Sequence, residues 1–194
     1  AVDGIRDLVG ARGLGVVYMR QGQYPWIKEK FGIVNTPYSG MEHQTIIAYG
    51  NDYKYNDKGY DFLLFHELAH EWWGNYLSVS DWADFWIHEG FAIYSEALFI
   101  EEKYGVNEYN NFFKKNLLKK IPLNKPVVLD RNSTMKQIMG LDPYYKGAYV
   151  LHMLRYVIGD DYFFKVLDEF LHSKKQSPNN QVTTSDFINI VNNI

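Results

Sequence analysis

Two histidines with an acidic residue beside the first are the side chains of this sequence best suited to metal chemistry. They lie in the stretch His66-Glu67-Leu68-Ala69-His70. On a helix, histidines four positions apart stand one turn apart on the same face, where both imidazoles can reach one metal ion. Glu67 is then placed to act on a water molecule at that metal. The H-E-x-x-H pattern is typical of zinc hydrolases, in which the glutamate serves as general base.

The residues on both sides of this stretch are apolar or aromatic. Residues 61–65 read D-F-L-L-F, and residues 72–74 read W-W-G. They predict a buried helix whose ionisable side chains face inward. Unpaired buried polar groups are costly, so a bound metal is favoured over the alternative, a surface helix with coincidental spacing.

A third ligand is needed, because hydrolytic zinc sites usually have three protein ligands and an open position for water. Residues 84–104 form a second helical pattern, in which Glu89 lies among aromatic residues and is expected to point back at the first helix. The resulting His-His-Glu set suits zinc. His88 competes for this role, but it lies about 100° around the helix from Glu89, so we expect only one of them to bind the ion. Glu96, two turns further on, is either a carboxylate that holds a ligand imidazole or an ordinary solvated charge.

The longer motifs resemble a known family. H-E-x-x-H followed, after eighteen intervening residues, by Glu89 is the gluzincin arrangement. Residues 66–75 (H-E-L-A-H-E-W-W-G-N) and 82–92 (W-A-D-F-W-I-H-E-G-F-A) resemble the zinc aminopeptidase family of aminopeptidase N, which also contains the bifunctional leukotriene epoxide hydrolase. Residues 39–43 (S-G-M-E-H) resemble its G-x-M-E-N exopeptidase motif, and residues 144–148 (Y-Y-K-G-A) resemble its Y-x-K-G segment. The motifs occur in the family's order.

The resemblance implies a role for each matching position. His66, His70 and Glu89 would bind one zinc ion. Glu67 would be the base that takes a proton from a metal-activated water.

On the substrate side, Tyr144 matches the family's tyrosine that stabilises the oxyanion. Glu42 matches the glutamate that binds the free α-amino group of the substrate. The backbone of Gly40 and Met41 would line the substrate cleft.

Three positions depart from the family pattern. His43 replaces the asparagine of G-x-M-E-N, Ser39 stands where glycine or alanine is common, and His88 stands where asparagine is usual. A histidine at position 43 still donates a hydrogen bond but adds a titratable group. We therefore expect it to affect the first substrate pocket more than the chemistry.

These assignments predict a zinc-dependent aminopeptidase whose partner is a peptide with a free N-terminus. Two alternatives remain open: a zinc endopeptidase or epoxide hydrolase on the same scaffold, and a catalytically inactive binding domain. Glu42 distinguishes the exopeptidase from the endopeptidase, because it would pair with a substrate ammonium group.

Composition excludes other classes of protein. Of 194 residues, 46% are hydrophobic and 22% charged, as in an ordinary globular protein and not a disordered one. The net charge of −3 gives no basic patch for nucleic acid and no electrostatic argument for membrane binding. Cysteine is absent from the sequence, which excludes disulfides, and no secretory or transmembrane pattern indicates a compartment, so localisation stays unknown.

The expected fold is α+β: a single thermolysin-like zinc peptidase catalytic domain over residues 1–194, with a small mixed sheet followed by a mainly helical lobe. Residues 1–56 would form the strand-rich part with the substrate-binding motif, and residues 57–194 the helical part with the zinc site. Members of the resembled family also have a β-sandwich domain before the catalytic one and helical repeats after it. We therefore expect flanking domains of the same protein to be missing and this chain to be an excised or processed domain.

Hydrophobic periodicity and turn residues locate the elements. Expected strands are 16–19, 31–36 and 42–49, with a turn at 37–40. Expected helices are 60–76, 84–104, 107–119, a short one capped by Ser133-Thr134 and ending near 139, 144–158, one ending near 172, and a last one capped by Thr184 or Ser185, with a polar loop over 173–183 before it. Four tryptophans are expected to pack between the two metal-bearing helices: Trp72, Trp73, Trp82 and Trp86.

Overall fold

The computed structural model describes residues 22–117, 121, 124–139, 142–173 and 180–194. Its strands are β1 (Gly32–Asn35), β2 (Gly40–Met41), β3 (Ile46–Tyr49), β4 (Ser78–Val79) and β5 (Gln181–Val182). Its α-helices are α3 (Phe62–Ala69), α4 (Trp86–Tyr104), α5 (Val106–Asn111), α6 (Met135–Met139), α7 (Pro143–Ile158), α8 (Asp160–His172) and α9 (Thr184–Asn193). A 3₁₀-helix, η1 (Trp82–Asp84), precedes α4, and a π-helix, η2 (Phe112–Leu117), follows α5.

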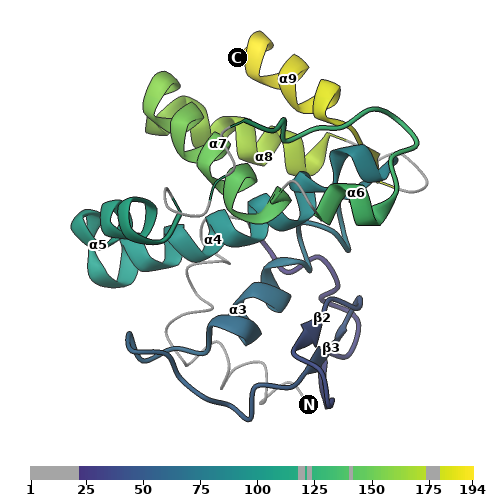
Figure 1. The fold of residues 1–194 in the computed structure, drawn as a ribbon, viewed down its shortest axis with the longest axis vertical. Coiled ribbons are helices and arrows are strands. Elements are labelled where there is room, and N and C mark those ends of the chain that lie inside the picture. Colours follow the sequence, from purple (N-terminus) through teal and green to yellow (C-terminus); the bar gives the residue numbers. More distant parts are fainter. Residues whose placement is uncertain (1–21, 118–120, 122–123, 140–141, 174–179) are drawn as a thin grey trace.

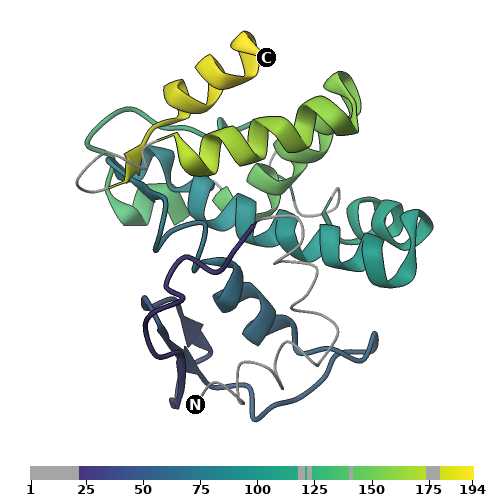
Figure 2. The same cartoon turned by 180° about the vertical axis from the view of Figure 1, so that it is seen from behind.

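Helix α4 runs through the middle of the molecule. Helix α3 and the strands β2 and β3 lie on one side of it, and α7, α8 and α9 lie on the other (Figure 1). The view from behind shows the same order of layers (Figure 2). No helix in the described parts of the chain is long and apolar enough to cross a membrane.

The first sheet is small and mixed, as expected. Strand β3 is central, with β1 parallel on one side and β2 antiparallel on the other. The predicted strand over 42–49 is too long, because Thr45 has a positive φ of 63° that interrupts the extended chain. The predicted turn over 37–40 is also partly wrong, since Gly40 pairs with Tyr49 at the start of β2.

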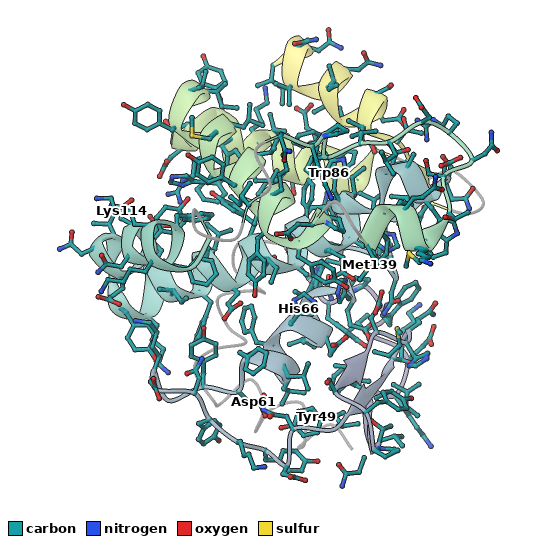
Figure 3. The ribbon with its side chains drawn as sticks, viewed as in Figure 1. Tyr49, Asp61, His66, Trp86, Lys114 and Met139 are labelled. Atoms are coloured by element: carbon teal, nitrogen blue, oxygen red, sulfur yellow. The ribbon has the colours of Figure 1, made fainter. Side chains whose placement is uncertain are left out.

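Asp61 ties the start of α3 to the sheet. As the N-cap residue, it accepts the backbone N–H groups of Leu63 and Leu64 at 3.1 and 3.2 Å. The same carboxylate accepts the hydroxyl of Tyr49, the last residue of β3, and the side-chain amide of Asn51. Figure 3 shows Tyr49 and Asp61 next to one another, on the far side of α3 from Trp86.

Helix α4 is buried on all sides over most of its length, and its last turn is more exposed. A helix that is apolar around its whole circumference must be covered by other elements, which explains its central place. Gly105 ends it with a φ of 88°, as a glycine after a helix C-terminus commonly does.

A buried arginine joins the helices on the far side of α4. Arg155 on α7 makes a bidentate pair with Glu101 on α4 at 2.7 and 3.1 Å. It also contacts Asp160 at the start of α8 at 2.9 and 2.7 Å. These charge-assisted contacts fix α7 and α8 against α4.

Several expected elements differ from the structure. The helix expected over 60–76 ends at Ala69, and the one expected over 107–119 divides into α5 and η2. The strands β4 and β5 form a parallel pair that the sequence did not predict, because two residues show no periodicity. The last helix is capped by Thr183, one residue before the predicted cap, through a capping box with Asp186.

The tryptophans follow the prediction with one exception. Trp72, Trp73 and Trp86 are buried, but Trp82 is 50% exposed because it lies in η1, before α4 enters the core. The strand expected over 16–19 lies outside the described residues.

Candidate metal centre and active site

The two histidines meet at the C-terminal end of α3. His66 lies in the last turn, and His70 is the C-cap residue with helical dihedral angles of −64° and −17°. The helical spacing therefore persists for one residue beyond the helix, and the two Nε2 atoms lie 3.2 Å apart. Figure 3 shows His66 on the side of α3 that faces α4 and α7.

Glu89, in the first turn of α4, completes a cluster of three donor atoms. Its Oε2 lies 3.2 Å from Nε2 of His66 and 3.4 Å from Nε2 of His70. Donor atoms at zinc–ligand distances of about 2.0–2.2 Å and tetrahedral angles are about 3.3 Å apart. The triangle of His66, His70 and Glu89 therefore has the size and donor types that fit a zinc ion.

A backbone carbonyl holds His70 in the orientation that a ligand needs. Nδ1 of His70 lies 2.9 Å from the carbonyl oxygen of Trp73, which can only accept a hydrogen bond. Nδ1 therefore carries a proton and donates it in this hydrogen bond, and Nε2 faces the cluster. Gly74 makes room for this hydrogen bond, since a Cβ on Gly74 would lie 3.4 Å from Nδ1 of His70. The φ of Gly74 is +133°, a conformation that side chains rarely allow.

The charges in the cluster favour a cation. Burial opposes ionisation of Glu89, but His70 and the hydrogen bonds from both imidazoles hold the pKa of this carboxyl below its usual range. Burial also acts against a charged His70, yet the Glu89 carboxylate raises the pKa of His70 to about 10. Glu89 is thus an ionised carboxylate in a buried place, where a positive partner is strongly stabilising.

Glu67 faces the same space with an oxygen that has no partner. The side chain is 5% exposed, and its Oε2 makes no hydrogen bond within the described part of the protein. On the other side, a Cβ on Gly40 would lie 2.5 Å from Oε1, so the glycine backbone of β2 packs directly against this carboxylate. Burial raises the pKa of Glu67 to about 7, which is suitable for a group that both takes and returns a proton.

Tyr144, in the first turn of α7, approaches the cluster from the other side of α4. Its ring stacks on that of His66, with centroids 6.3 Å apart and planes at 23°. Burial, followed by the charge and hydrogen bond of Glu89, raises the pKa of the Tyr144 hydroxyl above its ordinary value. The hydroxyl therefore stays protonated and remains a hydrogen-bond donor.

The segment expected to bind substrate lies beside Glu67. One carboxylate oxygen each of Glu42 and Glu67 and one ring nitrogen of His70 all lie within 4.8 Å of one another. Glu42 is half-buried, and the neighbouring Met41 is 47% exposed. The structure thus places the motif of residues 39–43 next to the candidate metal centre.

Two residues that the sequence left open do not belong to the donor cluster. Nε2 of His88 accepts the backbone N–H of Val79 at 3.2 Å, and burial lowers the pKa of His88 to about 4. Glu96 is neither a solvated charge nor a partner of a ligand imidazole. It is buried, and its Oε1 accepts the hydroxyl of Tyr60 at 2.5 Å.

Glu71 has a role that sequence reasoning missed. Its carboxylate is fully buried and accepts the backbone N–H of Thr45 at 2.9 Å. Thr45 has the unfavourable positive φ noted above, so this hydrogen bond helps to hold the segment after Glu42 against the residue that follows His70. An acidic residue between a histidine and two tryptophans was the only available signal.

Glu96 gives a prediction about stability and pH. Burial raises the pKa of the Glu96 carboxyl in the folded protein to about 7, whereas the same carboxyl in the unfolded chain has an ordinary pKa near 4.5. Between these two pH values the folded protein keeps a proton that the unfolded chain has already released. The free energy of unfolding therefore falls as the pH rises from about 4.5 to 7. Glu96→Gln keeps an acceptor for Tyr60 and avoids the buried charge, so it should raise that free energy by about 2–3 kcal/mol at pH 8 and hardly change it at pH 5.

Urea unfolding of both proteins at the two pH values measures this difference. The comparison at equal pH removes any effect of pH on the rest of the molecule. An equal change at both pH values would show that the Glu96 carboxyl does not titrate as described.

The sequence model "Peptidase family M1 domain" matches residues 20–194. The chain belongs to peptidase family M1. The expected relationship to aminopeptidase N and leukotriene hydrolase is thereby confirmed, together with the α+β fold of a zinc peptidase catalytic domain.

Individual M1 relatives show how far the similarity extends. Aminopeptidase N of Mus musculus is 35% identical over 128 residues, which are 59% of this chain and 13% of that protein. A variant of the M1 zinc metallopeptidase from Deinococcus radiodurans, bound to a Tyr-Ser-Ala substrate, is 27% identical with a TM-score of 0.74, over 95% of this chain and 40% of that one. Leukotriene A4 hydrolase from Saccharomyces cerevisiae, at 20% identity, shares the fold with a TM-score of 0.75, over 94% of this chain and 31% of that one.

The chain spans only a small part of the curated M1 relatives and less than half of the solved ones. The match to the family model, over residues 20–194, nevertheless includes every residue of the candidate site, because all of them lie between residues 40 and 144. Membership of a family with zinc metallopeptidases agrees with the donor set described above.

Proposed function

We propose that this chain carries the catalytic site of a zinc-dependent aminopeptidase, which hydrolyses the N-terminal peptide bond of peptides with water. The observation that supports this most is the donor triangle of His66, His70 and Glu89. Beside it lie a carboxylate oxygen without a partner on Glu67 and a second carboxylate on Glu42. These groups together can hold a metal, move a proton and bind an amine.

His66, His70 and Glu89 would hold the ion. When bound, zinc supplies Lewis acidity and lowers the pKa of a coordinated water to about 7. The hydrogen bond from His70 to Trp73 keeps the lone pair of Nε2 directed at the ion and so reduces the cost of binding it.

Glu67 would act as general base and then as general acid. Its Oε2 has no competing hydrogen bond, so it is free to accept a proton from the attacking water. The pKa near 7 lets the same oxygen return the proton to the departing amine. The packing of Oε1 against Gly40 fixes the carboxylate in one orientation, which supports proton transfer along one path.

Tyr144 would donate a hydrogen bond from its hydroxyl to the carbonyl oxygen of the substrate as negative charge develops there. A preorganised donor acts mainly on the transition state, because the ground-state carbonyl carries less charge. The stacking on His66 keeps the Tyr144 ring beside the donor cluster.

Glu42 would bind the α-ammonium group of the substrate. Its carboxylate lies within 4.8 Å of the Glu67 carboxylate, and two such groups together attract a cation. The ammonium group would then set which peptide bond reaches Glu67, namely the first in the chain. The names of the curated relatives and the Tyr-Ser-Ala peptide on the solved relative agree with this substrate class.

A half-buried carboxylate beside the general base can pair with a substrate ammonium group, so this position of Glu42 favours the exopeptidase over the endopeptidase. Epoxide hydrolysis is the other candidate on this scaffold. It is supported here only by similarity to a leukotriene hydrolase at 20% identity, which shows the fold alone.

The proposal is tested with a pair of tripeptides that differ only in N-terminal acetylation. We expect the free peptide to be cleaved, the acetylated one to be cleaved at least about 100-fold more slowly, and a zinc chelator to abolish both rates until zinc is restored. Equal cleavage of the two peptides would contradict the aminopeptidase assignment. Activity that survives full removal of zinc would contradict the metal site.

A further inference from the structure

Helices α4 and α7 touch through their backbones at two glycines. A Cβ on Gly90 would lie 2.7 Å from Cα and 2.8 Å from the carbonyl carbon of Gly147. A Cβ on Gly147 would lie 2.8 Å from Cα of Gly90 and 3.3 Å from Trp86. Contacts below 3.0 Å are essentially never made by real Cβ atoms, so neither position admits a side chain unless the helices separate.

On both helices this crossing lies within one helical turn of a residue of the candidate active site. Gly90 follows Glu89 directly, and Gly147 lies one helical turn after Tyr144. The contact between the glycines therefore lies close to the point where Tyr144 approaches Glu89 and the ring of His66.

Glycine is an unfavourable choice at both positions if the helices alone are considered. Both residues lie inside helices, where glycine is among the least stabilising residues and alanine the most. Neither has the positive φ that would require glycine, in contrast to Gly105 and Gly159. The close approach of the two backbones is the physical reason for them.

We propose that Gly90 and Gly147 are positioning residues of the catalytic site, which set the distance of the Tyr144 hydroxyl from the metal ligand Glu89. The proposal rests on the proposed role of Tyr144 as the oxyanion donor. Neither glycine has a side chain with which to bind substrate or metal. Each acts through the separation of α4 and α7.

The test variants are Gly147→Ala and, from the opposite helix, Gly90→Ala. The matched control is Gly159→Ala at the C-terminal end of α7, where φ is +79° and no atom lies within 4 Å of the added Cβ. The control strains the backbone and lowers the melting temperature, but it leaves the crossing intact. All variants are made in the full chain and compared for kcat, KM, bound zinc and melting temperature.

We expect the two crossing variants to bind one zinc ion each and to lose about 10- to 100-fold in kcat with little change in KM, because a displacement on the order of 1 Å is enough for such a loss. Gly159→Ala should keep its kcat. In a Tyr144→Phe background, Gly147→Ala should cause little further loss, since the hydroxyl it displaces is already absent.

Three results would overturn the proposal. The first is normal kcat in a folded Gly147→Ala or Gly90→Ala protein, and the second is a loss that simply adds to that of Tyr144→Phe. The third is failure of both alanine variants to fold, which would make the crossing a requirement of the fold alone. Failure of the proposed function looks different, because the unmodified chain would then lack aminopeptidase activity or Tyr144→Phe would retain full kcat.

Discussion

Glu67→Gln is expected to lower kcat by about 10³-fold while the protein still binds one zinc ion. Loss of a general acid–base group typically costs about 10²- to 10⁴-fold, and Glu67 is proposed to handle the proton in both steps. Glutamine has the same shape and still fits against Gly40, but its amide cannot accept a proton in the way that a carboxylate with a pKa near 7 can. Steady-state kinetics with atomic spectroscopy for zinc measures both quantities.

Glu71→Gln is the matched control for this variant. The same substitution is made four residues later, at a buried carboxylate whose Oε1 accepts the Thr45 N–H, and the glutamine carbonyl can keep that bond. We expect the control to retain most of its kcat. If Glu67→Gln remained as active as the control, Glu67 would have no part in proton transfer.

Tyr144→Phe is expected to lower kcat by about 10²- to 10³-fold, the cost of removing one donor from an oxyanion site. The ring is retained, so the stacking on His66 should persist and KM should change much less than kcat. Tyr149→Phe, on the same helix, is the control, because the Tyr149 ring packs against Phe113 and His152 rather than near the donor cluster. A variant with weakened substrate binding and normal kcat would show that Tyr144 binds substrate and does not stabilise the oxyanion.

The relative position of the two histidines could be predicted from the sequence, and the reason is local. The four-residue spacing of His66 and His70 on a helix fixes their relative position, so the pair could be predicted without knowledge of the fold. The role of Glu89 could be predicted because a lone carboxylate in a buried helix needs a positively charged partner. The structure brings these three side chains together.

The features that orient those side chains could not be predicted, because they depend on the backbone. The carbonyl of Trp73 that holds His70 has no residue-specific signal. The contact of Gly90 with Gly147 joins segments 57 positions apart in the sequence, and the pairing of β4 with β5 joins segments about 100 positions apart. Only the three-dimensional path of the chain reveals such pairs.

At two positions, tertiary structure overrides the burial or backbone conformation that the residue type alone would predict. Trp82 was expected in the core on its residue type, but the short η1 helix leaves it half-exposed. Thr45 belongs to a β-branched run that favours a strand, yet its hydrogen bond to Glu71 stabilises a left-handed conformation there. In both cases a nearby contact outweighs the intrinsic preference.

The carboxylate of Asp61 joins the two ends of the segment that connects β3 to α3. Because Tyr49, Asn51 and the first turn of α3 all bind this one side chain, Asp61 fixes the start of the helix that carries the histidines. The tip around Tyr55, whose side chain is 74% exposed, is therefore the place where extra residues such as a labelling tag can be inserted at small entropic cost.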